Sequence, residues 1–196
     1  MKKLLLLALL APSIACAGDD ATHWITQSDK SSIEWSVSYG GKPLTGELPF
    51  TAEIFFDPKH LSKSNVDVTI NTAKVTSSDK DAKENLPGAE WFASKQYPTA
   101  SFKSSAFQTY EESVLKNIKG YNYNYVTEGT LTLRGKPVKI TMPFSLKFSE
   151  DNSYVVMNGE VSIKRLDFGV GTGDWQKTDT VGNDVKVTVH LEAKRD

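Results

Sequence analysis

The sequence has little cysteine, little histidine and no excess of charge of one sign. Cys16 is the single cysteine among 196 residues, which excludes an internal disulfide and a cysteine-based zinc site. Lys and Arg together number 23 and Asp and Glu number 24, so the net charge of -1 argues against a polybasic nucleic-acid binder. No series of long apolar runs is present, which excludes a protein with several helical membrane spans. A composition that is 39% hydrophobic and 24% charged indicates one globular domain.

Residues 1–17 have the form of a secretory signal peptide. Lys2 and Lys3 precede the apolar run 4–10, and Ala15-Cys16-Ala17 has the A-x-A form that a signal peptidase cuts. We therefore expect export to the periplasm and a mature domain over residues 18–196. The alternative is lipidation of Cys16, which the lipobox disfavours because Ser13 stands where leucine is usual.

The rest of the chain alternates between apolar and polar residues, which predicts β-strands. Long strands are expected over 44–56, 138–148, 155–163 and 185–191. Shorter ones are expected over 33–39, 66–70, 129–133 and 100–106, the last with Ala100, Phe102, Ser104 and Ala106 on its inner side, and a leading strand over 23–25. Residues 77–94 break the alternation and predict two short helical pieces, with Ser78 and Asp81 as a weak capping box. Residues 110–125 follow no period and are expected to form a long excursion between strands.

Two architectures satisfy this pattern, a sandwich of two sheets and a barrel closed on itself. A closed barrel removes exposed strand edges, and eight strands enclose either a core filled by side chains or space for one small ligand. Periodicity favours the barrel but leaves open whether its interior is hollow.

Candidate chemical sites are few. His23, His60 and His190 lie far apart with no metal-ligand spacing, and His190 is expected on the outer face of its strand. The glycine-rich segment 169–173 lacks the G-x-G-x-x-G spacing and indicates a turn. Around it lie Arg165, Asp167, Phe168 and Trp175. From local sequence alone, a surface ion pair between Arg165 and Asp167, with Phe168 closing one end of the barrel, is favoured over a head-group site.

Several motifs in order resemble the YceI-like family of secreted bacterial proteins. Residues 96–104 contain its YPTA-x-F-x-S pattern, and residues 54–58 resemble its strand end I-F-D-P. Residues 129–138 are similar to its G-L-T-L-x-G-x-x-x-P-V segment, and residues 164–171 to its x-R-x-D-F-G-I-G segment. Gly40-Gly41 and Leu86-Pro87-Gly88 depart from the family pattern at the expected pocket rim.

The resemblance implies an all-β fold, an extended lipocalin-like eight-stranded antiparallel β-barrel with a short helical segment. It also implies a periplasmic protein whose apolar tunnel binds a polyisoprenoid such as a polyprenyl phosphate or quinone, with no metal and no cofactor besides that lipid. The expected partners are the long-chain lipid and no nucleic acid, and both transient membrane contact and a homodimer are compatible with this reading. The expected tunnel lining is Trp35, Val37, Phe50, Val68, Phe102, Leu131, Leu133, Phe144, Met157 and Val187. The expected mouth and head-group residues are Arg165, Asp167, Phe168 and Trp175.

Three alternatives stay open. The same tunnel could take fatty acids or fatty amides. An enzyme acting on such a lipid would need an inward polar cluster, for example Asp167 with a histidine or serine. A filled barrel would bind no lipid at all.

Overall fold

The computed structural model describes residues 21–111 and 123–196. The predicted signal peptide 1–17, with Cys16, and most of the excursion over 110–125 lie outside these residues. Within the described ranges, no helix has the length and apolar character needed to cross a membrane.

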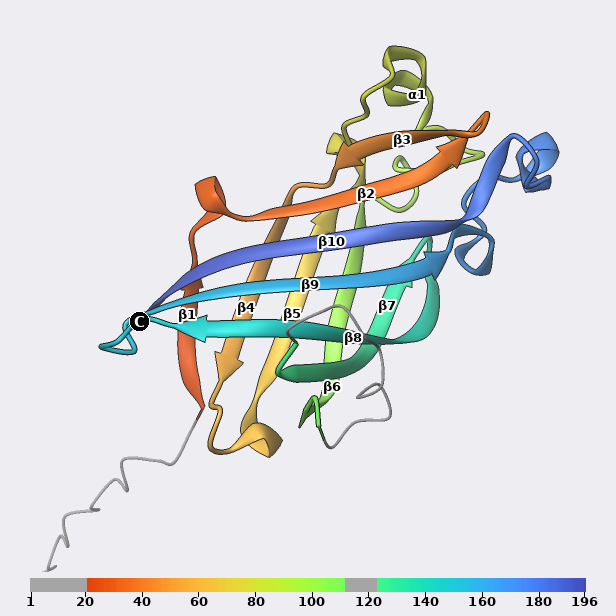
Figure 1. Ribbon diagram of the computed structural model, residues 1–196. Coiled ribbons are helices and arrows are strands. Elements are labelled where there is room, and N and C mark those ends of the chain that lie inside the picture. The colour runs from red at the N-terminus through yellow and green to blue at the C-terminus, as the bar shows by residue number, and fades with distance from the viewer. Residues whose placement is uncertain (1–20, 112–122) are drawn as a thin grey trace, which may run out of the picture.

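Ten strands form one antiparallel sheet (Figure 1). They are β1 (Thr22–Thr26), β2 (Ser32–Tyr39), β3 (Lys42–Glu47), β4 (Phe50–Phe56), β5 (Asn65–Asn71), β6 (Thr99–Thr109), β7 (Tyr125–Leu133), β8 (Lys136–Phe148), β9 (Tyr154–Lys164) and β10 (Val181–Arg195). The helix α1 (Lys80–Asn85) is accompanied by short 3₁₀ turns η1 (Ser28–Lys30), η2 (Leu61–Lys63), η3 (Thr72–Lys74), η4 (Arg165–Phe168) and η5 (Gly173–Gln176).

The sheet closes because β10 has two partners on one side. Residues Val181 to His190 of β10 pair with β2, and residues Ala193 to Arg195 pair with β1. β1 and β2 therefore take one position in the barrel as an interrupted strand. β4 pairs with β1 and β3 pairs with β2, so β3 and β4 together take the next position. With β5 to β10 they complete the closed eight-stranded antiparallel barrel that the resemblance implies, so this prediction is confirmed.

One strand prediction is wrong in detail. The alternation over 44–56 predicts a single strand, but β3 ends at Glu47 and β4 begins at Phe50. Pro49 lies in the gap and has no N–H for a ladder hydrogen bond, while Leu48 N donates to Ile33 O at 2.9 Å. The break lets this wall change partner, since β3 pairs with β2 whereas β4 pairs with β1 and β5.

The helical segment is also shorter than expected. Only Lys80–Asn85 is α-helical, and the following residues 86–94 fold as turns. The N-cap is Asp79 rather than Ser78, because Asp79 Oδ1 accepts a 2.8 Å hydrogen bond from Ala82 N. In Figure 1, α1 and the loop between β9 and β10 lie at one end of the barrel, and η2 and the C-terminus lie towards the other.

Candidate functional site

An apolar cavity of about 180 Å³ lies inside the barrel. Every strand except β3 contributes to its wall, and all of its lining residues are apolar except Thr72 and Thr127. Both hydroxyls are used by the main chain: Thr72 Oγ1 donates to Tyr97 O at 2.8 Å, and Thr127 Oγ1 donates to Ala106 O at 3.2 Å. Among the described residues, the wall therefore carries no titratable side chain and no free polar group that could bind a charged head.

The cavity exists partly because Gly129, which has no side chain, lets a neighbouring ring lie against the inner wall. Gly129 lies in phase with Leu131 and Leu133 on β7, and both of these leucines line the cavity. A Cβ on Gly129 would lie 2.4 Å from Cε2 and Cζ of Phe102, so the Phe102 ring occupies the place of the missing side chain. The ring lies against the wall and leaves the lumen beside it open.

The structure places eight of the predicted lining residues on the cavity wall: Phe50, Val68, Phe102, Leu131, Leu133, Phe144, Met157 and Val187. The placement of Trp35 and Val37 on this wall is wrong. They belong to a separate cluster with Val75, Leu86 and Val181, at the end of the barrel that carries α1. The Trp35 ring reaches across to β3, where its Cζ2 lies 2.6 Å from the Cβ position of Gly46.

Arg165 does not lie at an open mouth, and it makes no surface ion pair with Asp167. Its side chain is only 3% exposed, and its three nitrogens donate to main-chain carbonyl oxygens of Val170, Gly171, Trp175, Lys177, Val181 and Gly182. Asp167 lies on the same 3₁₀ turn η4 and is exposed. Burial lowers the pKa of the Arg165 guanidinium, since desolvation disfavours its charged form. The residue thus organises the loop between β9 and β10 and has no donor directed at a ligand.

A second arginine, Arg134, extends this arrangement and has no role in the sequence-based prediction. It follows β7 at a positive φ of 51°. Its guanidinium donates to the carbonyl oxygens of Ala89, Glu90 and Trp91 and also to Gly169 O. We call residues 86–94 and 165–176, with these two arginines, the arginine cap.

The remaining predicted mouth residues belong to the arginine cap. Phe168 is 1% exposed and packs against the inner cluster with Leu131 and Leu133. Trp175 is half-buried, donates from Nε1 to Glu90 Oε2 at 3.1 Å, and lies 5.2 Å from the Trp91 ring. This end of the lumen is closed by side chains and by main-chain hydrogen bonds.

Towards the opposite end of the barrel, where β4 and β6 end and β7 begins, aromatic rings pack together across the lumen. Phe56, Phe107, Tyr125 and Phe144, from β4, β6, β7 and β8, form a cluster that we call the aromatic plug. Phe56 lies 5.5 Å from both Phe107 and Tyr125 and 6.4 Å from Phe144, measured between ring centroids. Burial raises the pKa of the Tyr125 hydroxyl.

Phe107 is absent from the predicted site because a β-bulge reverses the phase of β6. Alternation from Ala100 through Phe102 and Ser104 predicts that Ala106 faces inward. The pairing of β6 with β7 shifts register between Ser104 and Ala106, which turns Phe107 to the cavity instead. No residue type marks a bulge, so alternation continued in one phase from Ala100 assigns the wrong face to residues after Ser104.

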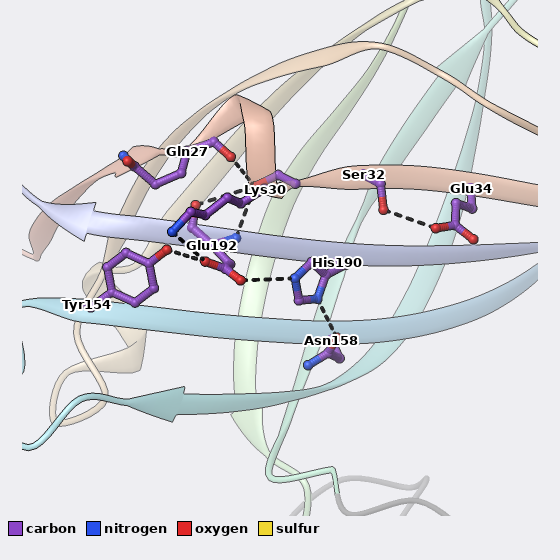
Figure 2. Close-up of polar contacts among 9 residues, drawn as sticks. Gln27, Lys30, Ser32, Glu34, Tyr154, Asn158, His190 and Glu192 are labelled. Atoms are coloured by element: carbon purple, nitrogen blue, oxygen red, sulfur yellow. Dashed lines mark hydrogen bonds and ion pairs between the residues drawn. The ribbon is translucent and has the colours of Figure 1, made fainter.

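His190 and Glu192 of β10 lie on the outside of the barrel, and Figure 2 shows their contacts. His190 Nδ1 lies 2.7 Å from Asn158 Oδ1, and His190 Nε2 lies 3.5 Å from Glu192 Oε1. Glu192 also accepts a hydrogen bond from Tyr154 and lies 3.9 Å from Lys30 Nζ. Since Val189 and Leu191 line the cavity, alternation places His190 and Glu192 outside it, as predicted for His190. No group of three or more His, Cys, Asp or Glu residues that could hold a metal occurs in the two described ranges.

This cluster stabilises the seam at which the barrel closes. Glu192 O accepts from Gln27 N at 2.8 Å, and Glu192 N donates to Ser31 Oγ at 3.0 Å, on either side of η1. These contacts span the point where β10 changes its partner from β2 to β1. The Tyr154 hydroxyl lowers the pKa of Glu192, because its hydrogen bond favours the carboxylate.

Comparison with known sequences finds a family and relatives for the whole barrel. A family model described as "YceI-like domain" matches residues 24–193. A UPF0312 protein of Vibrio cholerae is 30% identical over 151 residues, which cover 74% of this chain and 75% of the relative. A UPF0312 protein of Pectobacterium atrosepticum is 27% identical and covers 100% of this chain and 99% of its own.

Solved structures share the fold. The crystal structure of Burkholderia cenocepacia BcnA aligns with a TM-score of 0.75 and 30% identity, over 86% of this chain and 99% of BcnA. A polyisoprenoid binding domain from Saccharophagus degradans, implicated in plant cell wall breakdown, aligns with a TM-score of 0.64 and 11% identity. That alignment covers 90% of this chain and 100% of the other, and at this identity it establishes the fold alone.

Proposed function

Since this chain belongs to the YceI-like domain family, we propose that it is a periplasmic binding protein for a long-chain isoprenoid lipid, such as a polyprenyl phosphate or quinone. The guest's apolar tail occupies the lumen, and the protein carries or sequesters it. The observation that carries this proposal is the cavity wall, which is apolar throughout except for two threonine hydroxyls already bonded to the main chain. One structural neighbour is described as a polyisoprenoid binding domain, which supports the choice of ligand class.

The driving force is the transfer of hydrocarbon from water to the lumen. Each buried methylene contributes about 0.8 kcal/mol, so several buried isoprene units offset the cost of immobilising a flexible chain. The same wall does not offset the desolvation cost of a buried charge, because it offers no free hydrogen-bond donor to that charge. A phosphate head therefore stays outside the lumen, and a neutral quinone ring is the more readily accommodated head.

Binding rather than catalysis is the activity that this wall supports. A reaction on a bound lipid needs a nucleophile, a general acid or base, or a metal next to the reacting atoms. His190 and Glu192 of β10 lie on the outer face, although their strand neighbours Val189 and Leu191 line the cavity. Periplasmic location rests on the predicted signal peptide.

Native mass spectrometry tests the proposal. The full chain is expressed with its signal sequence, purified from the periplasmic fraction, and examined for co-purified lipid. The protein is then delipidated and offered farnesol, ubiquinone and palmitic acid separately. We expect isoprenoid adducts and a raised melting temperature with the prenyl compounds. Uptake of palmitic acid alone would mean that the ligand is a fatty acid rather than an isoprenoid. The absence of any adduct in all samples would refute lipid binding.

A further inference from the structure

The cavity inside the barrel is too small to hold the whole chain of a long-chain isoprenoid. Its volume of about 180 Å³ is similar to that of an engineered cavity of about 150 Å³ that holds one benzene molecule. A prenyl chain of several isoprene units is much larger than benzene. Any guest longer than the cavity must therefore displace side chains at one end of the lumen.

The arginine cap is held by contacts that a guest cannot easily displace. Arg165 and Arg134 together join residues 86–94, 165–176 and the start of β10 through charged hydrogen bonds to main-chain carbonyls. Gly171 N and Thr172 N both donate to Glu90 O at 2.8 Å, which ties the two segments directly. Opening this end would leave a buried guanidinium without its acceptors, which is costly.

The aromatic plug is held differently. Its rings come from walls that face each other, since β4 and β8 lie four strands apart in the ring of eight, and Phe56 and Phe144 nevertheless lie 6.4 Å apart. Phe107 completes the contact, at 5.5 Å from Phe56 and 6.2 Å from Phe144. These contacts are ring packing, and a buried methylene chain can replace them with contacts of the same kind.

Phe107 is the ring of the plug best placed to move. It lines the cavity and is only half-buried, whereas Phe56 and Phe144 are buried. Tyr125 is also half-buried but does not line the cavity. Rotation of a half-buried ring towards solvent extends the lumen without breaking a hydrogen bond of the wall.

We propose that Phe107 is the residue that sets the longest chain the barrel accepts. This inference rests on the proposed function, because it assigns a length limit to the same lumen. A chain that fits the cavity leaves Phe107 in place, and a longer chain binds only by displacing its ring. Truncating the ring therefore favours long guests over short ones.

The test measures the affinities of geraniol, farnesol and geranylgeraniol, which share a head group and lengthen by one isoprene unit at each step. Wild type is compared with Phe107→Ala and with Phe55→Ala. Phe55 is half-buried, does not line the cavity and stacks on His23 with 4.8 Å between ring centroids, so the control removes the same atoms from outside the lumen. We expect Phe107→Ala to raise the affinity ratio of geranylgeraniol to geraniol by about tenfold, since each further buried methylene changes affinity several-fold. Phe55→Ala should leave the ratio within about twofold of wild type, because it adds no space to the lumen.

Two further variants keep the test decisive if Phe107→Ala does not fold. Phe107→Leu preserves an apolar contact and should shift the ratio in the same direction by a smaller factor, whereas Phe107→Trp enlarges the plug and should lower the ratio. Unchanged ratios in all Phe107 variants, or an equal shift in Phe55→Ala, would overturn the assignment of Phe107 while leaving lipid binding intact. Failure of every protein to bind any of the three alcohols would instead refute the proposed function.

Discussion

Arg165 Nη2 donates a hydrogen bond of 2.9 Å to the carbonyl oxygen of Val181, the first residue of β10. Arg165 itself follows the last residue of β9, so this one contact joins the two ends of the loop between the last two strands. The other donors of the guanidinium reach carbonyls inside the loop, and Gly171 approaches so closely that a Cβ there would lie 2.2 Å from Nη1. The loop is thus folded around a buried cation, whereas Asp167 on the same turn lies in solvent.

Replacement of Arg165 by methionine should destabilise the protein strongly. The variant keeps a long apolar stem but leaves several buried carbonyls without a donor, and we expect the free energy of unfolding to fall by about 3 kcal/mol. Urea denaturation measures this change. Arg195→Met is the matched control, because Arg195 is exposed near the C-terminus, and its effect should stay within about 0.5 kcal/mol. Equal losses in the two variants would contradict the role assigned to Arg165.

Gly129→Ala should destabilise the barrel through overpacking. The added methyl would lie 2.4 Å from the Phe102 ring and 2.6 Å from Lys103 O, so both the ring and the neighbouring strand must shift. We expect a loss of about 1–3 kcal/mol, partly restored by a second change, Phe102→Leu. In the control Gly182→Ala the nearest atom lies 3.4 Å away, and thermal unfolding should change little. A neutral Gly129→Ala would mean that the Phe102 ring does not lie over this glycine.

Acid should weaken the turn between β8 and β9. Hydrogen bonds from Ser149 and Ser153 hold the pKa of Asp151 at about 2, below its ordinary value of 3.8. A lowered folded-state pKa means that the carboxylate stabilises the fold above about pH 4, and that this contribution is lost as the pH falls from about 4 to about 2. Asp151→Asn should therefore flatten the pH dependence of the melting temperature in this window. Glu150→Gln, which changes the neighbouring exposed carboxylate, should retain the dependence of the wild type.

Tyr154→Phe should raise the pKa of Glu192. The Tyr154 hydroxyl is the largest cause of the lowered value, and its removal leaves His190 and Lys30 as weaker favourable neighbours. Carbon-detected NMR of the glutamate carboxyl groups measures the titration directly. Tyr39→Phe removes an exposed hydroxyl on β2 and serves as the control, for which the Glu192 titration should not move. A Glu192 titration unaltered by Tyr154→Phe would exclude this hydrogen bond in solution.

Hydrophobic alternation predicted most of the strands, the all-β class and most of the residues that face inward. Its period of two assigns each residue to one face of the sheet, and Phe50, Val68 and Met157 accordingly line the lumen. The family motifs, which occur in the same order along this chain, identified the family and implied a closed barrel. This information is local, because each strand carries its own pattern.

The ends of the lumen were decided by contacts between distant segments. Arg165 appears exposed beside Asp167 in the sequence, yet it is buried because carbonyls up to Gly182 fold around it. Phe107 turns inward because one extra residue in β6 reverses the strand's phase, and Trp35 leaves the wall because Gly46 on β3 leaves room for its ring. Bulges and hydrogen bonds to main-chain carbonyls have no residue-type signature, so only the folded chain shows which side chains close the barrel and how much space they leave.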